Sequence, residues 1–246
     1  MSQGLNLTGA QSTSQSNTDD GRGLLTVSNV LMTQLERCWQ DGIYLVNLRH
    51  RFWRLTLQLL SRYCSFVTRQ ISSHQTPTEP QTTSTPSTSN LKPLLFLLVD
   101  CFQLIAYVRV ALPAHISSKL GTLDTAAANE SPSSFPTWLT ECLEEVCERI
   151  HQTINPLQSL IVDQLLRSCL NFSRQILDVP RQYRRTNRSL PTTSSTYVSA
   201  MIDPLSELGD LCRTAVIAAS CAKPALEQLI NRAVTQLSEA FPKAPH

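Results

Sequence analysis

Residues 50–63 read HRFWRLTLQLLSRY, and the fold of the whole chain is interpreted from this stretch. Its apolar residues recur at steps of three and four, the spacing of a helix face. One series comprises Phe52, Leu55, Leu59, Tyr63 and Phe66, and a second comprises Trp53, Leu57, Leu60, Cys64, Val67 and Ile71. Because the two series cover much of the circumference, they predict a helix of about twenty residues buried between its neighbours. The remaining exposed stripe is basic and comprises Arg51, Arg54, Gln58, Ser61, Arg62 and Arg69.

The composition favours an all-α protein. Apolar residues make up 41% of the 246 residues, which is enough for a hydrophobic core, and glycine is scarce, with 7 residues. The long apolar segments are rich in Leu rather than in alternating Val, Ile and Thr. Charged residues are only 16% of the chain, below the usual quarter or so, and Ser and Thr concentrated in a few segments replace them. This pattern predicts packed helices separated by flexible loops.

The charge and the cysteines exclude several classes of protein. A net charge of +2 is too small for nucleic-acid binding over the whole surface, and no zinc-finger or RNP-type motif occurs. Nearly all of the 8 cysteines lie at apolar positions of predicted helices, where free thiols behave as small hydrophobes. Without a signal peptide, they indicate a reducing compartment. The longest apolar run, 93–112, is interrupted by Asp100, Gln103 and Arg109, which predicts a buried helix rather than a membrane span.

The periodic segments predict a helical bundle or rod of about seven amphipathic helices. They span residues 25–48 (with a break at Gly42), 50–71, 92–112, 136–155, 156–179, 196–222 (bent at Pro204) and 224–241. Residues 1–23 lack apolar periodicity and are expected to be a disordered head, and 242–246 a tail. Residues 24–241 then form one helical domain, with flexible insertions at 72–90 and 113–134.

The motifs that would carry catalysis or metal binding are incomplete or absent. Cys142, Cys147 and His151 share one predicted helix, but no second ligand pair at zinc spacing accompanies them, so they are interpreted as core cysteines beside a surface histidine. No nucleophile elbow and no phosphate-binding glycine loop occur. The acidic residues of the same helix are interpreted as a solvated face: Glu141, Glu144, Glu145 and Glu148. We therefore expect neither an enzyme, nor a metal, nor a cofactor.

An arginine cluster is the surface feature that rises above the background. It comprises Arg181, Arg184, Arg185 and Arg188, with no acidic residue among them. One interpretation is a helix-terminal linker in which the first arginines favour the C-terminal dipole of the preceding helix. The other is a contact surface for an acidic partner or for anionic lipid. A whole-chain alternative of this second kind is a peripheral membrane-binding protein that uses amphipathic helices together with the cluster.

Two stretches resemble the C-terminal region of subunit 2 of the conserved oligomeric Golgi complex. The first is CWQDGIYL at 38–45 followed by residues 50–63, and the second is VPRQYRRTNR at 179–188, continuing through Pro191, Ser195, Tyr197 and Val198 to Pro204-Leu205. The resemblance covers residues 30–240. It implies a subunit of a helical-rod tethering complex on the cytosolic face of the Golgi, which acts in retrograde vesicle and protein transport within the stack. The implied partners are the other subunits of the complex, SNAREs, Rab GTPases and golgins.

One departure from that family concerns the N-terminal side. Full-length members carry a long N-terminal part with coiled-coil segments, and no heptad region of that kind occurs in this sequence. The resemblance therefore implies a fragment, an incomplete gene model or a shortened paralogue. In each case the binding role of the C-terminal helices is the part that is expected to remain.

Overall fold

The computed structural model describes residues 26–75, 91–120, 137–170 and 196–240, and all regular structure in these ranges is helical. The α-helices are α1 (Thr26–Cys38), α2 (Arg49–Gln75), α3 (Leu91–Leu120), α4 (Thr137–Leu170), α7 (Thr196–Ala218) and α8 (Lys223–Ala240). Two short 3₁₀ helices, η2 (Val46–Leu48) and η4 (Ser220–Ala222), precede α2 and α8. The prediction of an all-α bundle is confirmed.

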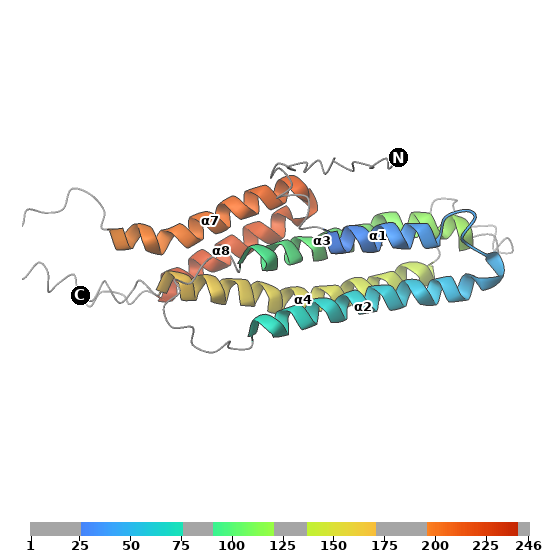
Figure 1. Cartoon of the computed structure of the whole chain (residues 1–246), viewed down its shortest axis with the longest axis horizontal. Coiled ribbons are helices and arrows are strands. Elements are labelled where there is room, and N and C mark those ends of the chain that lie inside the picture. Colours follow the sequence, from blue (N-terminus) through green and yellow to red (C-terminus); the bar gives the residue numbers. More distant parts are fainter. Residues whose placement is uncertain (1–25, 76–90, 121–136, 171–195, 241–246) are drawn as a thin grey trace, which may run out of the picture.

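The helices form an elongated bundle (Figure 1). The pair α3 and α4 shares the most extensive packing; α1 lies along α3, and α2 lies along α4. The α7–α8 hairpin packs against α3 and α4 as well. The connection between α1 and α2 therefore sits at one end of the bundle, on the side away from α7 and α8 (Figure 1).

The central helix is α3, which is buried around most of its circumference. Its fully enclosed side chains include Leu94, Leu95, Leu98, Val99, Leu104, Val108, Leu112 and Ile116. By length and composition α3 could cross a membrane, but most of its apolar stretch is covered by the bundle. The prediction that the apolar run 93–112 forms a buried helix is confirmed.

Helix α2 is an outer helix, so the prediction that residues 50–71 are enclosed between neighbours was wrong. It buries a single stripe, which comprises Thr56, Leu60, Tyr63, Val67 and Ile71. Leu55, from the predicted apolar face, is 39% exposed. The predicted basic stripe is confirmed, since Arg51, Arg54, Arg62 and Arg69 are all exposed. Arginines recur along the helix, and their charge keeps this face in water.

Two prolines at expected helix boundaries, Pro113 and Pro156, lie inside helices. Helix α4 runs through Pro156, so the helices expected at 136–155 and 156–179 are one, and α3 runs through Pro113. Proline removes one backbone hydrogen bond, which usually breaks or kinks a helix. Here Ile154 and Leu157 on either side of Pro156 are buried in the same core, while Pro156 itself faces solvent, where the freed carbonyl oxygen can be hydrated.

Other boundaries also differ from those expected. The first residues of both predicted insertions are helical, because α2 extends to Gln75 and α3 to Leu120. The helix expected at 196–222 ends at Ala218, and η4 turns the chain into α8. The break at Gly42 is confirmed, and Gly42 has a φ of +90°, a conformation that favours glycine. The predicted head, the tail and the rest of both insertions lie outside the described residues.

Candidate functional site at the corner between α1 and α2

Three aromatic rings hold the corner where the chain leaves α1 and enters α2. The ring of Tyr44 stacks on Trp39 with centroids 5.3 Å apart and contacts Phe52 at 5.5 Å. Trp39 also donates its Nε1–H to Oγ1 of Thr56 on α2, at 3.0 Å. Such ring contacts bury large apolar area and add a geometric preference of their own. The cluster therefore fixes the angle between the two helices.

Backbone bonds close the turn that carries Tyr44 into this cluster. The amides of Ile43 and Tyr44 both donate to the carbonyl oxygen of Gln40, and the Leu48 amide donates to Leu45. The Tyr44 hydroxyl donates to the Lys119 carbonyl oxygen at the end of α3, at 3.3 Å. The corner is therefore anchored to α3 as well as to α1 and α2.

The side chains next to Tyr44 point away from the cluster. Ile43, Leu45 and Val46 are 45%, 55% and 62% exposed. The exposed arginines of α2 follow them directly along the chain. We name this region the corner surface, and its members are Ile43, Leu45, Val46, Arg51, Arg54 and Arg62.

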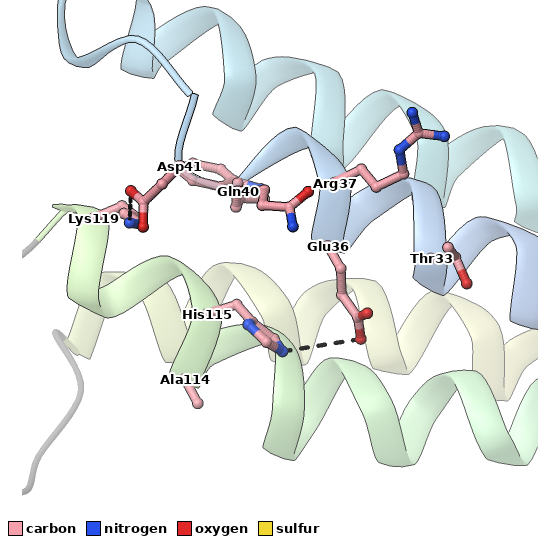
Figure 2. Close-up of a pocket in the computed structure, with 9 residues that line it drawn as sticks. Thr33, Glu36, Arg37, Gln40, Asp41, Ala114, His115 and Lys119 are labelled. Atoms are coloured by element: carbon pink, nitrogen blue, oxygen red, sulfur yellow. Dashed lines mark hydrogen bonds and ion pairs between the residues drawn. The ribbon is translucent and has the colours of Figure 1, made fainter. Parts of the chain in front are cut away.

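A polar cavity of about 390 Å³ lies on the inner side of the corner, between α1 and α3. Figure 2 shows Glu36 facing His115, with Oε1 and Nε2 3.9 Å apart, and Asp41 paired with Lys119. Both carboxylates thus face a side chain from α3. Among the described residues that line the cavity, the hydroxyl of Thr33 donates to a carbonyl oxygen of its own helix. The cavity lies between α1 and α3, and the described residues that line it include no activated nucleophile.

A buried carboxylate ties three helices together deeper in the bundle. Asp100 of α3 is 2% exposed. Its oxygens accept bonds from the Ser28 amide at 3.2 Å, the Ser28 hydroxyl and the Tyr63 hydroxyl at 3.2 Å. Asp100 thereby satisfies an amide in the first turn of α1, the role that a capping side chain has. Burial raises the pKa of Asp100, and these hydrogen bonds oppose the rise.

Cys142, Cys147 and His151, which were considered as metal ligands, have different surroundings in the structure. Burial raises the pKa of the Cys147 thiol to about 11. His151 contacts the ring of Phe102, and its Nδ1 lies 3.1 Å from the Cys147 carbonyl oxygen. Cys142 lines a small groove between α2 and α4. Within the described residues no group of three His, Cys, Asp or Glu side chains is arranged to hold a metal ion.

The acidic residues of α4 form the solvated face that the sequence predicts, because all four are exposed. Glu144 pairs with Arg109 of α3, and the hydrogen bond from Arg109 lowers the pKa of Glu144. Glu145 pairs with Arg149, one helical turn along α4. Glu144 and Glu145 are thus engaged by arginines, as expected for a solvated helix face.

The predicted arginine cluster, Arg181, Arg184, Arg185 and Arg188, lies outside the described residues. Sequence reasoning missed the aromatic cluster and the Asp100 network. The available signals were the aromatic residues on both sides of Gly42 and a single acid inside a long apolar run.

Residues 4–244 match the family described as "COG complex component, COG2, C-terminal". The chain belongs to this family. It is 31% identical over 205 residues to conserved oligomeric Golgi complex subunit 2 of Homo sapiens, a match that covers 75% of this chain and 28% of the human protein. The subunit 2 proteins of Drosophila melanogaster and Arabidopsis thaliana are 27% and 23% identical, with coverage of 77% and 89% of this chain and 25% and 28% of the relatives. No solved structure matches the chain.

This member of the subunit 2 family spans about a quarter of the length of the relatives it matches. The first stretch on which the resemblance rested, 38–45 with 50–63, is the corner itself: it supplies Trp39, Tyr44, Phe52 and Gly42. The second stretch lies largely outside the described residues.

Proposed function

We propose that this chain is the C-terminal helical part of a non-catalytic subunit in a Golgi vesicle-tethering complex. The observation that carries the proposal is the match of nearly the whole chain to the subunit 2 C-terminal family. The described residues support it, because their charged groups form ion pairs and surfaces rather than a catalytic arrangement. The proposed role is in intra-Golgi retrograde vesicle transport and Golgi organisation, through protein–protein contacts.

The proposed partners are first the other subunits of the conserved oligomeric Golgi complex. SNAREs, Rab GTPases and golgins are proposed as further partners, and the cytosolic face of the Golgi membrane as the location. For a partner-binding site we propose the arginine cluster of Arg181, Arg184, Arg185 and Arg188. Its four positive charges without an acid between them suit an acidic partner surface.

Affinity purification of the tagged chain from cells, followed by mass spectrometry, tests this function. Recovery of the other complex subunits would support it, and recovery of SNAREs or golgins alone would point to a detached distal arm of the tether. A well-folded chain that recovers none of these proteins would contradict the proposal.

The arginine cluster has its own test in the same assay. Arg184→Glu/Arg185→Glu is expected to weaken recovery of a partner without lowering the melting temperature. Arg167→Glu/Arg232→Glu is the matched control, because it changes the charge equally at two exposed arginines of α4 and α8. Equal losses in both variants would argue for a general charge effect, and a loss of fold would make the cluster structural.

A further inference from the structure

We propose that the corner surface binds an anionic membrane directly, with Ile43, Leu45 and Val46 inserted at the lipid interface and the α2 arginines on the headgroups. This inference goes beyond the proposed function, which rests on protein–protein contacts. It uses a different part of the chain from the arginine cluster at 181–188.

The apolar part of the corner surface is exposed on a turn that is held in place. Tyr44 is fixed between Trp39 and Phe52, and the turn is closed by backbone hydrogen bonds. Ile43 and Leu45 flank Tyr44 in the chain and lie in solvent, as does Val46. Because the turn is already ordered, insertion of these side chains would cost little conformational entropy. Entry into the bilayer interface would remove their apolar area from water.

On the α2 side of this turn the charge is of one sign, whereas Asp41, on its α1 side, is paired with Lys119. From Gly42 to Gln75 the chain has five arginines and no acidic residue. Arg51, Arg62 and Arg69 recur on one helix face, which extends about 27 Å at 1.5 Å per residue. None of the arginines of α2 forms an ion pair among the described residues, whereas Arg109 and Arg149, on neighbouring helices, both do. Anionic headgroups would supply the missing negative charge.

The shape of the corner favours a bilayer over an acidic protein. A partner helix docks its apolar face into a groove, but the apolar side chains here lie on the connection at one end of the bundle (Figure 1). The cavity behind the corner and the groove between α2 and α4 already contain acidic residues: Glu36 and Asp41 in the first, Glu145 in the second. An exposed apolar turn followed by arginines can insert into a lipid interface, which deforms around the inserted side chains.

Vesicle flotation with the full chain tests the proposal. Vesicles of phosphatidylcholine with phosphatidylserine are expected to carry the protein upward, and phosphatidylcholine alone is expected to leave it at the bottom. Arg51→Glu/Arg54→Glu should weaken binding by at least about thirtyfold, since two attractive charges are replaced by charges that anionic lipid repels. Raising the salt from about 0.1 to about 1 M should release the protein, because screening then acts within about 3 Å.

Matched variants separate the corner surface from general charge and hydrophobicity. The control for the arginines is Arg167→Glu/Arg232→Glu. Leu45→Ser/Val46→Ser is compared with Ile202→Ser/Ile217→Ser, which removes two apolar side chains of α7 that are 53% and 88% exposed. Only the corner variants should lose flotation, and none of the four should unfold at a markedly lower temperature than the wild type, because every changed side chain is exposed.

A second measurement does not depend on a loss of binding. In Leu45→Trp the new indole should be quenched by lipids brominated on their acyl chains, beyond the quenching of the native tryptophans in the wild type. Three results would each overturn the proposal: no flotation with phosphatidylserine vesicles, equal losses in corner and control variants, or no added quenching by brominated lipid in Leu45→Trp. Capture of an acidic protein by a chain that does not float would assign the surface to a protein partner instead.

Discussion

Helices α2 and α3 are both long, but their charged side chains have different surroundings. Three charged residues of α3 have partners elsewhere in the chain: Asp100 binds Ser28 and Tyr63, Arg109 binds Glu144, and Lys119 binds Asp41 in the turn after α1. The exposed arginines of α2 have no ion-pair partner among the described residues. On a central helix, a buried polar group costs free energy unless it is hydrogen-bonded. An outer helix can leave a face unpaired, and that face is available for binding.

The two helices therefore have different roles: α3 holds the bundle together, and α2 presents an exposed surface. Side chains of α3 hold α1, α2 and α4 in place, through the apolar core and through Asp100. Helix α2 contributes one buried stripe to that core and turns the corner surface outward. Changes in α3 should appear as lost stability, and changes on the outer face of α2 should appear as lost binding.

Core truncation should give the largest difference between the helices. Leu98 of α3 is fully buried, so Leu98→Ala is expected to lower the free energy of unfolding by about 2–5 kcal/mol, from lost burial and the cavity left behind. Leu55→Ala, the same change at the 39% exposed position of α2, should cost less than about 1 kcal/mol. Urea denaturation followed by circular dichroism measures both. Equal losses would mean that α2 is as deeply packed as α3.

Removal of the buried carboxylate should have the next largest effect. Asp100→Ala leaves the amide and hydroxyl of Ser28 and the hydroxyl of Tyr63 without their acceptor. We expect the free energy of unfolding to fall by about 2–3 kcal/mol, the usual cost of unsatisfied buried donors. Thermal unfolding measures it, and a loss no larger than that of an exposed substitution would place Asp100 outside the core.

The pH dependence of stability reports on the same carboxylate. Burial raises the pKa of Asp100 above its ordinary value of 3.8. The folded chain therefore holds this proton more tightly than the unfolded chain does. The resulting stabilisation is complete below about pH 3.8 and is lost as the pH rises through the folded-state pKa. Asp100→Asn should remove that part of the pH profile, and an unchanged profile would show that another group causes it.

The smallest effect is expected from charge reversal on the outer face. Arg51 lies in the first turn of α2, where no acidic residue offsets the positive end of the helix dipole. Arg51→Glu should therefore raise the free energy of unfolding by about 0.5 kcal/mol. Arg69→Glu, further from the helix ends, should bring no such gain. A marked destabilisation by Arg51→Glu would show that this arginine holds the fold together.

The amphipathic spacing predicted where most of the helices lie in the chain, but it did not predict which helices pack against one another. Residues 94–112 are apolar on nearly every side and residues 50–71 are amphipathic, yet the second stretch was predicted to be enclosed between its neighbours. Enclosure depends on which helices pack on which, and this information is not local. The helix break at Pro156 was mispredicted for the same reason. Burial of the residues on both sides of Pro156 outweighs the loss of one backbone hydrogen bond.

The corner surface was predictable only in part. The basic stripe followed from the spacing of Arg51, Arg54 and Arg62. The exposure of Ile43, Leu45 and Val46 did not, because apolar residues at a helix start usually pack inward. Their exposure depends on Tyr44, whose ring contacts link residues on both sides of the turn.

Hydrogen–deuterium exchange of the full chain, with and without phosphatidylserine vesicles, tests the division between α3 and α2 most directly. We predict that the amides of α3 exchange most slowly in the free protein, and that vesicles slow exchange at residues 43–62 while leaving α7 and α8 unchanged. Equal protection of α2 and α3 in the free protein, or vesicle protection confined to α7 and α8, would contradict it.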